Sequence, residues 1–184
     1  MIGRVLWQTT MSLDGFIAGP DDTMDWVLRF SGPNPVVDEI IPTIGATLSG
    51  RRSYDVGHRA GQRQEFQEVY AGAWKGPQFV LTHHPPNDEK DPTITFLSND
   101  IRIAVDMALR AANGKNVLII GADVARQCIE AALVDDIYLV IAPILLGDGV
   151  RLFSRKDAGQ VDLQLVGVSQ AGQLTNLHYR FPQA

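Results

Sequence analysis

The stretch that decides the fold class of this chain is Asn116-Val-Leu-Ile-Ile-Gly-Ala-Asp-Val-Ala-Arg126. Four apolar residues run directly into Gly121, which opens a segment whose apolar side chains recur at helical spacing. This pattern predicts a buried strand followed by an amphipathic helix, with Asp123 placed to cap its first turn. The helix stripe consists of Val124, Cys128, Ile129, Ala132 and Leu133. Such a glycine can present backbone N–H groups to a phosphate, but a plain tight connection has the same sequence.

A second stretch, Asp136-Ile-Tyr-Leu-Val-Ile-Ala-Pro-Ile-Leu-Leu-Gly-Asp-Gly149, follows shortly afterwards. Residues 137–142 are apolar on both faces, which is typical of a central strand covered on two sides. Residues 163–168 and 174–181 have the pattern of a final antiparallel pair. Strands alternate with helices until that hairpin, so the chain is expected to form an α/β sandwich with a mixed, mostly parallel sheet and an antiparallel edge.

The remaining segments fit the same α/β pattern. Strands are expected at 3–11, 45–50, 78–82 and 93–97, and helices at 25–32, 35–44, from 51 onward and at 100–112. Residues 12–23 and 83–92 are rich in turn-forming residues and are expected to be long loops. No boundary divides the apolar segments into two groups, so residues 1–184 are expected to be a single domain.

Composition narrows the class of protein. The chain has 184 residues, 45% of them hydrophobic, and a formal net charge of −5. An acidic chain argues against binding to nucleic acid or to an anionic membrane surface, which both reward basic patches. The only cysteine, Cys128, lies on an apolar helix stripe and has no disulfide partner. No apolar run reaches the ~20 residues of a membrane span, and the first residues read as a strand, so a cytoplasmic location is expected.

Three groups of residues follow predicted strands, where α/β sheets usually bind ligands. The first is Gly50-Arg-Arg-Ser53, whose guanidinium groups suit a phosphate, although pairing with Asp55 or Glu65 on a solvated turn is equally consistent. The second is Thr82-His83, which could flank a ribose, although a loop histidine is often incidental. The third is the turn at Gly121.

Several other site classes lack their sequence signatures. The chain contains no Gly-x-Gly-x-x-Gly, no Gly-Lys-Ser/Thr and no Gly-x-Ser-x-Gly. Its four histidines lack the spacing of zinc ligands in deaminases, and no metal site is expected.

Five short motifs in order resemble the reductase domain of bacterial riboflavin biosynthesis, the RibD C-terminal domain, and its dihydrofolate-reductase-like relatives. They are Met11-Ser-Leu-Asp-Gly-Phe-Ile-Ala18, Gly50-Arg-Arg-Ser-Tyr54, Val117-Leu-Ile-Ile-Gly121, Asp135-Asp136, and Ala142-Pro-Ile-Leu-Leu-Gly-Asp-Gly149 with Arg151-Leu-Phe153. They span nearly the whole chain. The resemblance implies a stand-alone domain with a dihydrofolate-reductase-like three-layer sandwich that binds NADPH along its sheet.

The resemblance also implies which residues meet the cofactor. Arg51, Arg52 and Ser53 would bind the cofactor phosphates, including the 2′-phosphate that distinguishes NADPH from NADH. Thr82 and His83 would flank the adenosine. Gly121, Ala122 and Asp123 would meet the pyrophosphate.

The implied chemistry is hydride transfer to a C=N or C=O carbon with a proton delivered to the heteroatom. Asp14 is the first candidate for a carboxylate near the reacting centre, although an Asp-Gly pair can simply shape a turn. Asp25 and Asp38 are the alternative acids. Trp26 could stack on a flat heterocycle or pack in the core. Leu146 and Gly147 would border the substrate end or a dimer contact.

The expected substrate is a pyrimidine-like, pterin-like or other small conjugated heterocycle, with 5-amino-6-(5-phosphoribosylamino)uracil as the named example. A noncatalytic dimer that binds a nucleotide or an aromatic ligand is the competing hypothesis. A third hypothesis is that the cofactor site is degenerate and that the protein binds only an aromatic ligand or a protein partner. The family further implies a homodimer.

Overall fold

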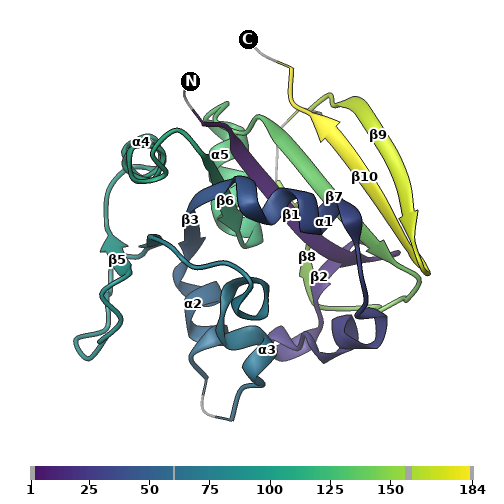
Figure 1. The fold of residues 1–184 in the computed structure, drawn as a ribbon, viewed down its shortest axis with the longest axis horizontal. Coiled ribbons are helices and arrows are strands. Elements are labelled where there is room, and N and C mark those ends of the chain that lie inside the picture. The colour runs from purple at the N-terminus through teal and green to yellow at the C-terminus, as the bar shows by residue number, and fades with distance from the viewer. Residues whose placement is uncertain (1–2, 60, 156–158, 183–184) are drawn as a thin grey trace.

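The main sheet of the computed structural model, which describes residues 3–59, 61–155 and 159–182, has eight strands in the order β5-β4-β3-β6-β1-β7-β10-β9 (Figure 1). Its strands are β1 Val5–Ser12, β3 Ile44–Gly50, β4 Gln78–Leu81, β5 Ile94–Leu97, β6 Asn116–Ile120, β7 Asp136–Ala142, β9 Gln164–Ala171 and β10 Leu174–Arg180. In this order, every neighbouring pair from β5 to β7 is parallel, whereas β10 is antiparallel to both of its neighbours, β7 and β9. The expected mixed sheet with an antiparallel C-terminal hairpin is confirmed.

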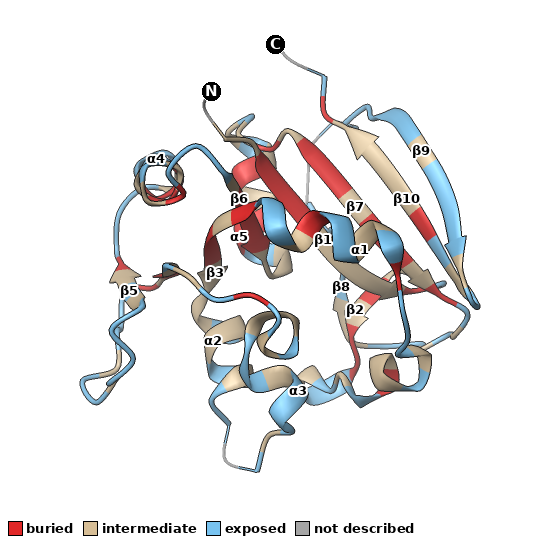
Figure 2. Ribbon diagram, viewed as in Figure 1, coloured by how far each residue is buried: buried red, intermediate tan, exposed pale blue. Residues whose placement is uncertain are grey.

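Helices cover both faces of the sheet and create three layers. On one face lie α4 (Ile101–Ala111) and α5 (Ala122–Glu130), and on the other lies α1 (Pro35–Ile40) (Figure 1). The alternating side chains of β1 supply both cores, because Val5 and Trp7 pack in the first and Leu6 in the second. Burial is greatest along β1, β6 and β7 and least along β9 (Figure 2).

Local signals explain where the two longer helices begin. The carboxylate of Asp100 accepts a hydrogen bond from the N–H of Arg102 at 2.9 Å and caps α4. The cap of α5 is Gly121, at φ 99° and ψ 143°, and no side chain bonds to its first turn. The expectation that Asp123 caps this helix is wrong, because Asp123 lies inside the first turn and accepts hydrogen bonds from later residues instead.

Two segments differ from the sequence prediction. The expected loop at 12–23 contains β2 (Phe16–Ala18), which pairs with the short strand β8 (Val150–Arg151), and the 3-10 helix η1 (Pro20–Asp22). The expected helix at 35–44 ends at Ile40, where the 3-10 helix η3 (Ile41–Thr43) replaces it. Pro42 explains this end, because it has no N–H to continue the α-helical ladder. The other helical segments are η2 (Asp25–Phe30), α2 (Arg51–Gly57), α3 (Gln64–Gln67) and η4 (Val69–Gly72).

A buried carboxylate joins strands at the end of the sheet where β1 and β7 begin. Asp136 is 1% exposed and lies 2.6 Å from Arg4, 2.9 Å from His178 and 3.3 Å from Arg180. The nearby cations offset the desolvation of this carboxylate. The cluster holds β1, β7 and β10 together and leaves the opposite end of the sheet, where the parallel strands finish, for ligands.

Cys128 is fully buried in the core between α5 and the sheet, and burial raises the pKa of its thiol to about 12. In the part of the chain that the structure describes, no helix is both long and apolar enough to cross a membrane. Within the same residues, no group of three or more His, Cys, Asp or Glu side chains is placed to hold a metal ion.

Candidate functional site

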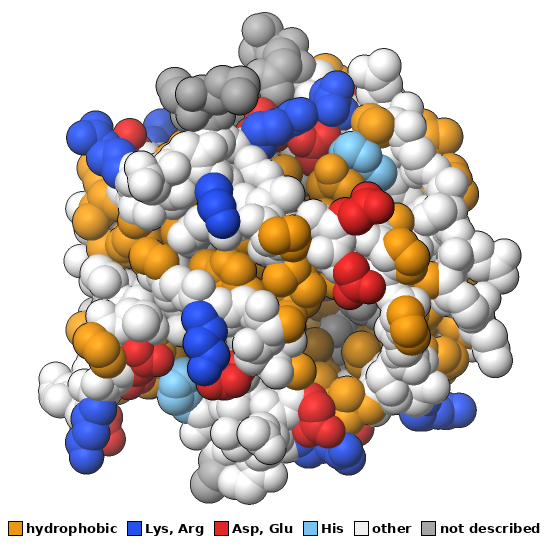
Figure 3. All heavy atoms as spheres, viewed as in Figure 1, with side chains coloured by type: hydrophobic (Ala, Val, Ile, Leu, Met, Phe, Trp, Pro, Cys, Tyr) orange, Lys and Arg blue, Asp and Glu red, His pale blue; other side chains and the backbone are white. Residues whose placement is uncertain are grey.

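A cavity of about 1160 Å³ opens where the parallel strands β1, β3, β4 and β6 end. Pairing brings these ends together, because Gly50 on β3 is opposite Leu81 on β4, and Ser49 is opposite Ile120 on β6. The cavity is lined by all eight residues expected to bind the cofactor, namely Arg51, Arg52, Ser53, Thr82, His83, Gly121, Ala122 and Asp123. On the face drawn in Figure 3, hydrophobic side chains gather around a hollow, and charged side chains stand both beside it and at the edge of the view.

The starts of α2 and α5 meet at the floor of this large cavity. A Cβ built on Gly121 would lie 2.5 Å from the Oγ of Ser53, and one built on Gly50 would lie 3.3 Å from a methyl carbon of Val124. The backbone of Gly121 lies in a region that glycine alone adopts readily. Glycine at both turns therefore lets α2 and α5 begin close together. We call the two backbone turns at Gly50 and Gly121 the cradle, whose N–H groups a phosphate-bearing ligand would meet.

The arginines on the large cavity already have protein partners. Arg51 donates to Asp55 at 2.7 Å and to the carbonyl of His84. Arg52 pairs with Asp22 at 2.7 Å, and the hydrogen bond to this carboxylate raises the pKa of Arg52. The pairing of Arg51 with Asp55 is the solvated-turn arrangement anticipated from the sequence. Both side chains are accessible, so an incoming phosphate can compete for them.

Asp123 belongs to a small charged group on the exposed side of α5. It accepts from Arg126 at 2.8 Å and from Gln127 at 2.8 Å, and Arg126 also donates to Glu130 at 2.8 Å. Burial acts to raise the pKa of Asp123, but the hydrogen bonds from Arg126 and Gln127 outweigh it and leave the pKa below its usual value. Asp123 therefore stays ionised and holds the Arg126 guanidinium beside the cavity.

The loop after β4 forms the other wall of the large cavity. Thr82 is buried, and its hydroxyl accepts a hydrogen bond from the N–H of His84 at 3.1 Å, while His83 is exposed. Farther along this loop, Glu89 accepts a hydrogen bond from Tyr54 of α2. Burial, followed by this contact, raises the pKa of Tyr54 to about 12. The contact ties the loop to α2 across the cavity.

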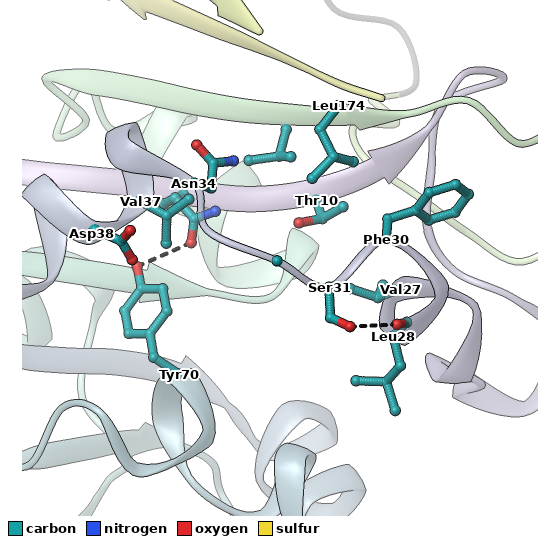
Figure 4. Close-up of a pocket in the computed structure, with 13 residues that line it drawn as sticks. Thr10, Val27, Leu28, Phe30, Ser31, Asn34, Val37, Asp38, Tyr70 and Leu174 are labelled. Carbon is teal, nitrogen blue, oxygen red and sulfur yellow. Dashed lines mark hydrogen bonds between the residues drawn. The ribbon is translucent and has the colours of Figure 1, made fainter. Parts of the chain in front are cut away.

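A second cavity of about 250 Å³ adjoins the first, between η2, the start of α1 and β1 (Figure 4). Gln8, Thr10, Val27 and Tyr70 line both cavities. These four residues mark the place where two ligands, one in each cavity, would meet. Asp38 lines the smaller cavity, the only one of the three candidate acids to line either cavity.

Tyr70 stands at this junction in an unusual conformation. Its hydroxyl donates to the Gln8 amide oxygen at 3.0 Å, and in Figure 4 it points toward the side of the cavity that Asp38 occupies. Burial raises the pKa of Tyr70 well above its usual value, so the hydroxyl is protonated at neutral pH. The backbone of Tyr70 has φ 51° and that of Ala71 φ 52°, both in the left-handed region that costs energy in residues with a side chain.

Asp14 lies outside both cavities and organises a loop. It accepts hydrogen bonds from the Ser12 hydroxyl at 2.6 Å and from the N–H groups of Leu146 and Gly147 at 3.0 and 2.7 Å. The Ser12 contact, together with these N–H groups, lowers the pKa of Asp14 to about 2. A carboxylate so engaged is a poor proton donor at neutral pH. Leu146 and Gly147 are therefore placed as the partners of Asp14 and not on a cavity wall.

Asp25 and Trp26 also line neither cavity. Asp25 is exposed at the start of η2. Trp26 is 8% exposed and packs inside, and its indole N–H has no hydrogen-bond partner among the described residues. The structure therefore does not bring these two residues to a ligand.

The residues at the junction of the two cavities were not predicted as site residues from the sequence. Gln8 and Thr10 are polar positions two apart on an otherwise strand-like segment, and this spacing places both on one face of β1. These two polar positions could therefore have indicated the junction from the sequence. Tyr70 follows no periodic pattern, and its left-handed backbone could not be read from the sequence.

Comparison with known proteins places the chain in a family. The model of the RibD C-terminal domain matches residues 4–177. YwjB of Bacillus subtilis (strain 168), described as an uncharacterized protein, is 26% identical over 171 residues, which are 92% of this chain and 92% of YwjB.

Solved structures share the fold. A putative riboflavin biosynthesis protein from Shewanella sp. PV-4 superposes with a TM-score of 0.80 at 19% identity, covering 98% of this chain and 99% of its own. Dihydrofolate reductase from Enterococcus faecalis, solved with NADP(H), superposes with a TM-score of 0.60 at 15% identity, covering 100% and 99%. The fold is therefore dihydrofolate-reductase-like, and the chain belongs to the RibD C-terminal domain family.

Proposed function

We propose that this protein is an NADPH-dependent reductase of a small conjugated heterocycle. The observation that carries the proposal is the junction of the two cavities at Gln8, Thr10, Val27 and Tyr70. A large cavity with arginines on its wall suits a cofactor, and a small, mostly apolar one suits a flat ring. Reductases in the same family and among its structural neighbours support the oxidoreductase class.

The residues on the large cavity fit NADPH. The side-chain-free cradle at Gly50 and Gly121 suits the pyrophosphate, and Arg51 and Arg52 suit the 2′-phosphate. Thr82 and His83 border the space left for the adenosine. When bound, NADPH supplies a hydride to a C=N or C=O carbon. The protein's part is to align the heterocycle and to exclude water from the reacting face.

Among the candidate acids, we assign the role beside the heterocycle to Asp38. Its carboxylate lines the small cavity, where it can accept hydrogen bonds from ring N–H groups and so orient the ring, while the proton for the reduced heteroatom is drawn from water. Tyr70, kept protonated by burial, donates to Gln8 and thereby sets the orientation of the Gln8 amide at the junction. Asp14 has a positioning role in this scheme, since it holds the loop at Leu146 and Gly147.

The substrate class follows from the shape of the small cavity and from the family. A pyrimidine-like or pterin-like ring is the proposed substrate, of the ring type found in 5-amino-6-(5-phosphoribosylamino)uracil, the example that the family resemblance offers. The Shewanella neighbour described as a riboflavin biosynthesis protein is consistent with that pathway. A protein that binds NADPH but oxidises it with no heterocycle would instead be a noncatalytic binder.

The double variant R51A/R52A tests the cofactor assignment. Removing both guanidinium groups should weaken NADPH binding by about tenfold or more and weaken NADH binding much less, because only NADPH carries the 2′-phosphate. Arg110→Ala is the matched control, since Arg110 is an exposed arginine of α4 that pairs with Asp106 away from both cavities. Equal losses for the two cofactors would show that the arginines do not read the 2′-phosphate.

A further inference from the structure

The two cavities differ in the charged side chains that line them. Among the described residues that line the smaller cavity, Asp38 and Tyr70 are the only ionisable ones, and Tyr70 is neutral. The larger cavity is lined by four arginines, Arg51, Arg52, Arg126 and Arg151, and by five acidic residues, Asp22, Glu65, Glu68, Asp100 and Asp123. The larger cavity therefore offers guanidinium groups to a phosphate, whereas the described lining of the smaller one has a carboxylate and no Lys, Arg or His.

The hydrogen-bonding groups of the smaller cavity can be counted in the same way. Asn34 is fully used, because its amide exchanges hydrogen bonds with Asn176 at 2.8 and 3.1 Å. The Asp38 carboxylate, the Thr10 hydroxyl and the Gln8 amide nitrogen have no partner among the described residues. The cavity thus offers three unpartnered groups, namely one carboxylate acceptor, one amide donor and one hydroxyl, besides the hydroxyls of Ser31 and Tyr70, which already donate to protein partners.

Apolar side chains enclose these three groups. Val27, Val37, Val140 and Leu174 line the smaller cavity, and Figure 4 shows Val27, Val37 and Leu174 around it. A flat ring with N–H and C=O groups on its edge would pack against these apolar side chains and form hydrogen bonds with the free polar groups. A phosphate would instead approach the Asp38 carboxylate, and like charges brought together oppose binding.

We propose that the substrate of this protein is a neutral or cationic heterocycle that carries no phosphate. The proposal rests on the reductase function proposed above and narrows its substrate class. It departs from the phosphoribosyl compound named there. The arginines that could bind a phosphate line the cofactor cavity, and the Arg151 guanidinium lies over the Phe16 ring at 4.7 Å.

The test uses one pair of compounds that differ only in phosphate. 5-Amino-6-(5-phosphoribosylamino)uracil and the same compound after phosphatase treatment are titrated by calorimetry into the full chain saturated with NADP⁺. Removing the phosphate should change the dissociation constant by less than about threefold or tighten binding. Asp38→Asn should weaken both compounds by about tenfold, because it removes the anionic acceptor.

Arg151→Ala and Arg29→Ala locate any phosphate contact. Arg151 lines the larger cavity, and Arg29 lies beside the smaller one in sequence, 5.8 Å from the Phe30 ring. Neither variant should change the ratio of the two dissociation constants. A preference of about tenfold for the phosphorylated compound, lost in either variant, would overturn the proposal.

The failure of this proposal is distinguishable from the failure of the proposed function. A separate titration with NADPH alone reports on the cofactor site. If NADPH does not bind, the reductase function fails, and the two compounds titrated into the free protein still decide the substrate class. If NADPH binds and neither compound does, the heterocycle site proposed for the smaller cavity is refuted.

Discussion

The Oγ of Ser53 occupies the space where a side chain at Gly121 would begin, since a Cβ there would lie 2.5 Å from this oxygen. Gly121 also has φ 99° and ψ 143°, which side chains disfavour. Gly121→Ala should therefore destabilise the fold by about 3 kcal/mol and abolish NADPH binding, because α2 and α5 must separate. Urea unfolding and a cofactor titration measure the two effects.

Two further variants isolate the steric contact. Ser53→Ala in the G121A background should recover part of the lost stability, because the next nearest atom of Ser53 is its Cβ at 3.8 Å. Gly172→Ala, at φ 59° with open space around it, should cost only about 1 kcal/mol and leave NADPH binding intact. Additive effects of S53A and G121A on the free energy of unfolding would show that the side chains at the two positions do not clash.

Asp14 should contribute pH-dependent stability. Its pKa falls from 3.8 to about 2 in the folded chain, so its contribution is full above about pH 4 and is lost as the pH falls toward about 2. Asp14→Asn should lower the free energy of unfolding at neutral pH. Its difference from the natural chain should become smaller as the pH falls from about 4 to about 2. Unfolding curves across the acid range measure it.

Asp148→Asn is the control for this titration, because Asp148 accepts only from its neighbour Gly149. It should leave the acid dependence close to that of the natural chain. A difference between D14N and the natural chain that stays constant down to about pH 2 would contradict the lowered pKa of Asp14.

The buried pair Asn34 and Asn176 should couple α1 to the hairpin. Asn34→Ala removes the hydrogen bonds of Asn176 at 2.8 and 3.1 Å and leaves its amide only the 3.3 Å bond to Ser169, so it should cost about 1–3 kcal/mol in urea unfolding. The double variant N34A/N176A should cost less than the sum of the single changes. Ser31→Ala, which removes an exposed hydrogen bond to Leu28, should cost no more than about 0.5 kcal/mol. Strict additivity of N34A and N176A would argue against the coupling.

The proposed homodimer has a candidate surface on the edge strand β9. Val168 is 60% exposed, Leu165 54% and Val166 46%, although the strand lies at the open edge of the main sheet. Exposed apolar edge strands favour pairing with another chain. Val168→Lys should shift sedimentation from a dimer to a monomer, whereas Ile103→Lys, at an exposed position of α4, should not. A natural chain that sediments as a monomer at every concentration would refute the dimer.

Much of the fold could be predicted because its signals are local. The apolar run into Gly121 and the stripe that follows predict β6 and α5, and the alternation at the end of the chain predicts the β9–β10 hairpin. The pairing of β2 with β8 was not predictable, since each is two or three residues long and is stabilised by its distant partner.

The residues of the candidate site could likewise be predicted from the sequence only where the signals are local. Residues next to strand ends, such as Arg51 and Gly121, were brought together as expected, because the parallel strands β3 and β6 are neighbours. Residues from loops were harder to place. Asp14 resembles a catalytic acid in sequence, but two of its three partners, Leu146 and Gly147, belong to a loop 132 and 133 residues away along the chain. Tyr70 reaches the junction through a backbone conformation that no sequence pattern reveals.

In the proposed function, the cradle between α2 and α5 holds NADPH, and Arg51 and Arg52 bind its 2′-phosphate. Thermal unfolding of the full chain with NADPH, with NADH and without ligand tests it most directly. At a hundredfold excess over its dissociation constant, a ligand that binds only the folded state stabilises it by about 2.7 kcal/mol. The account predicts a clear rise in Tm with NADPH and a smaller rise with NADH at the same concentration. No rise with either cofactor, or equal rises with both, would contradict it.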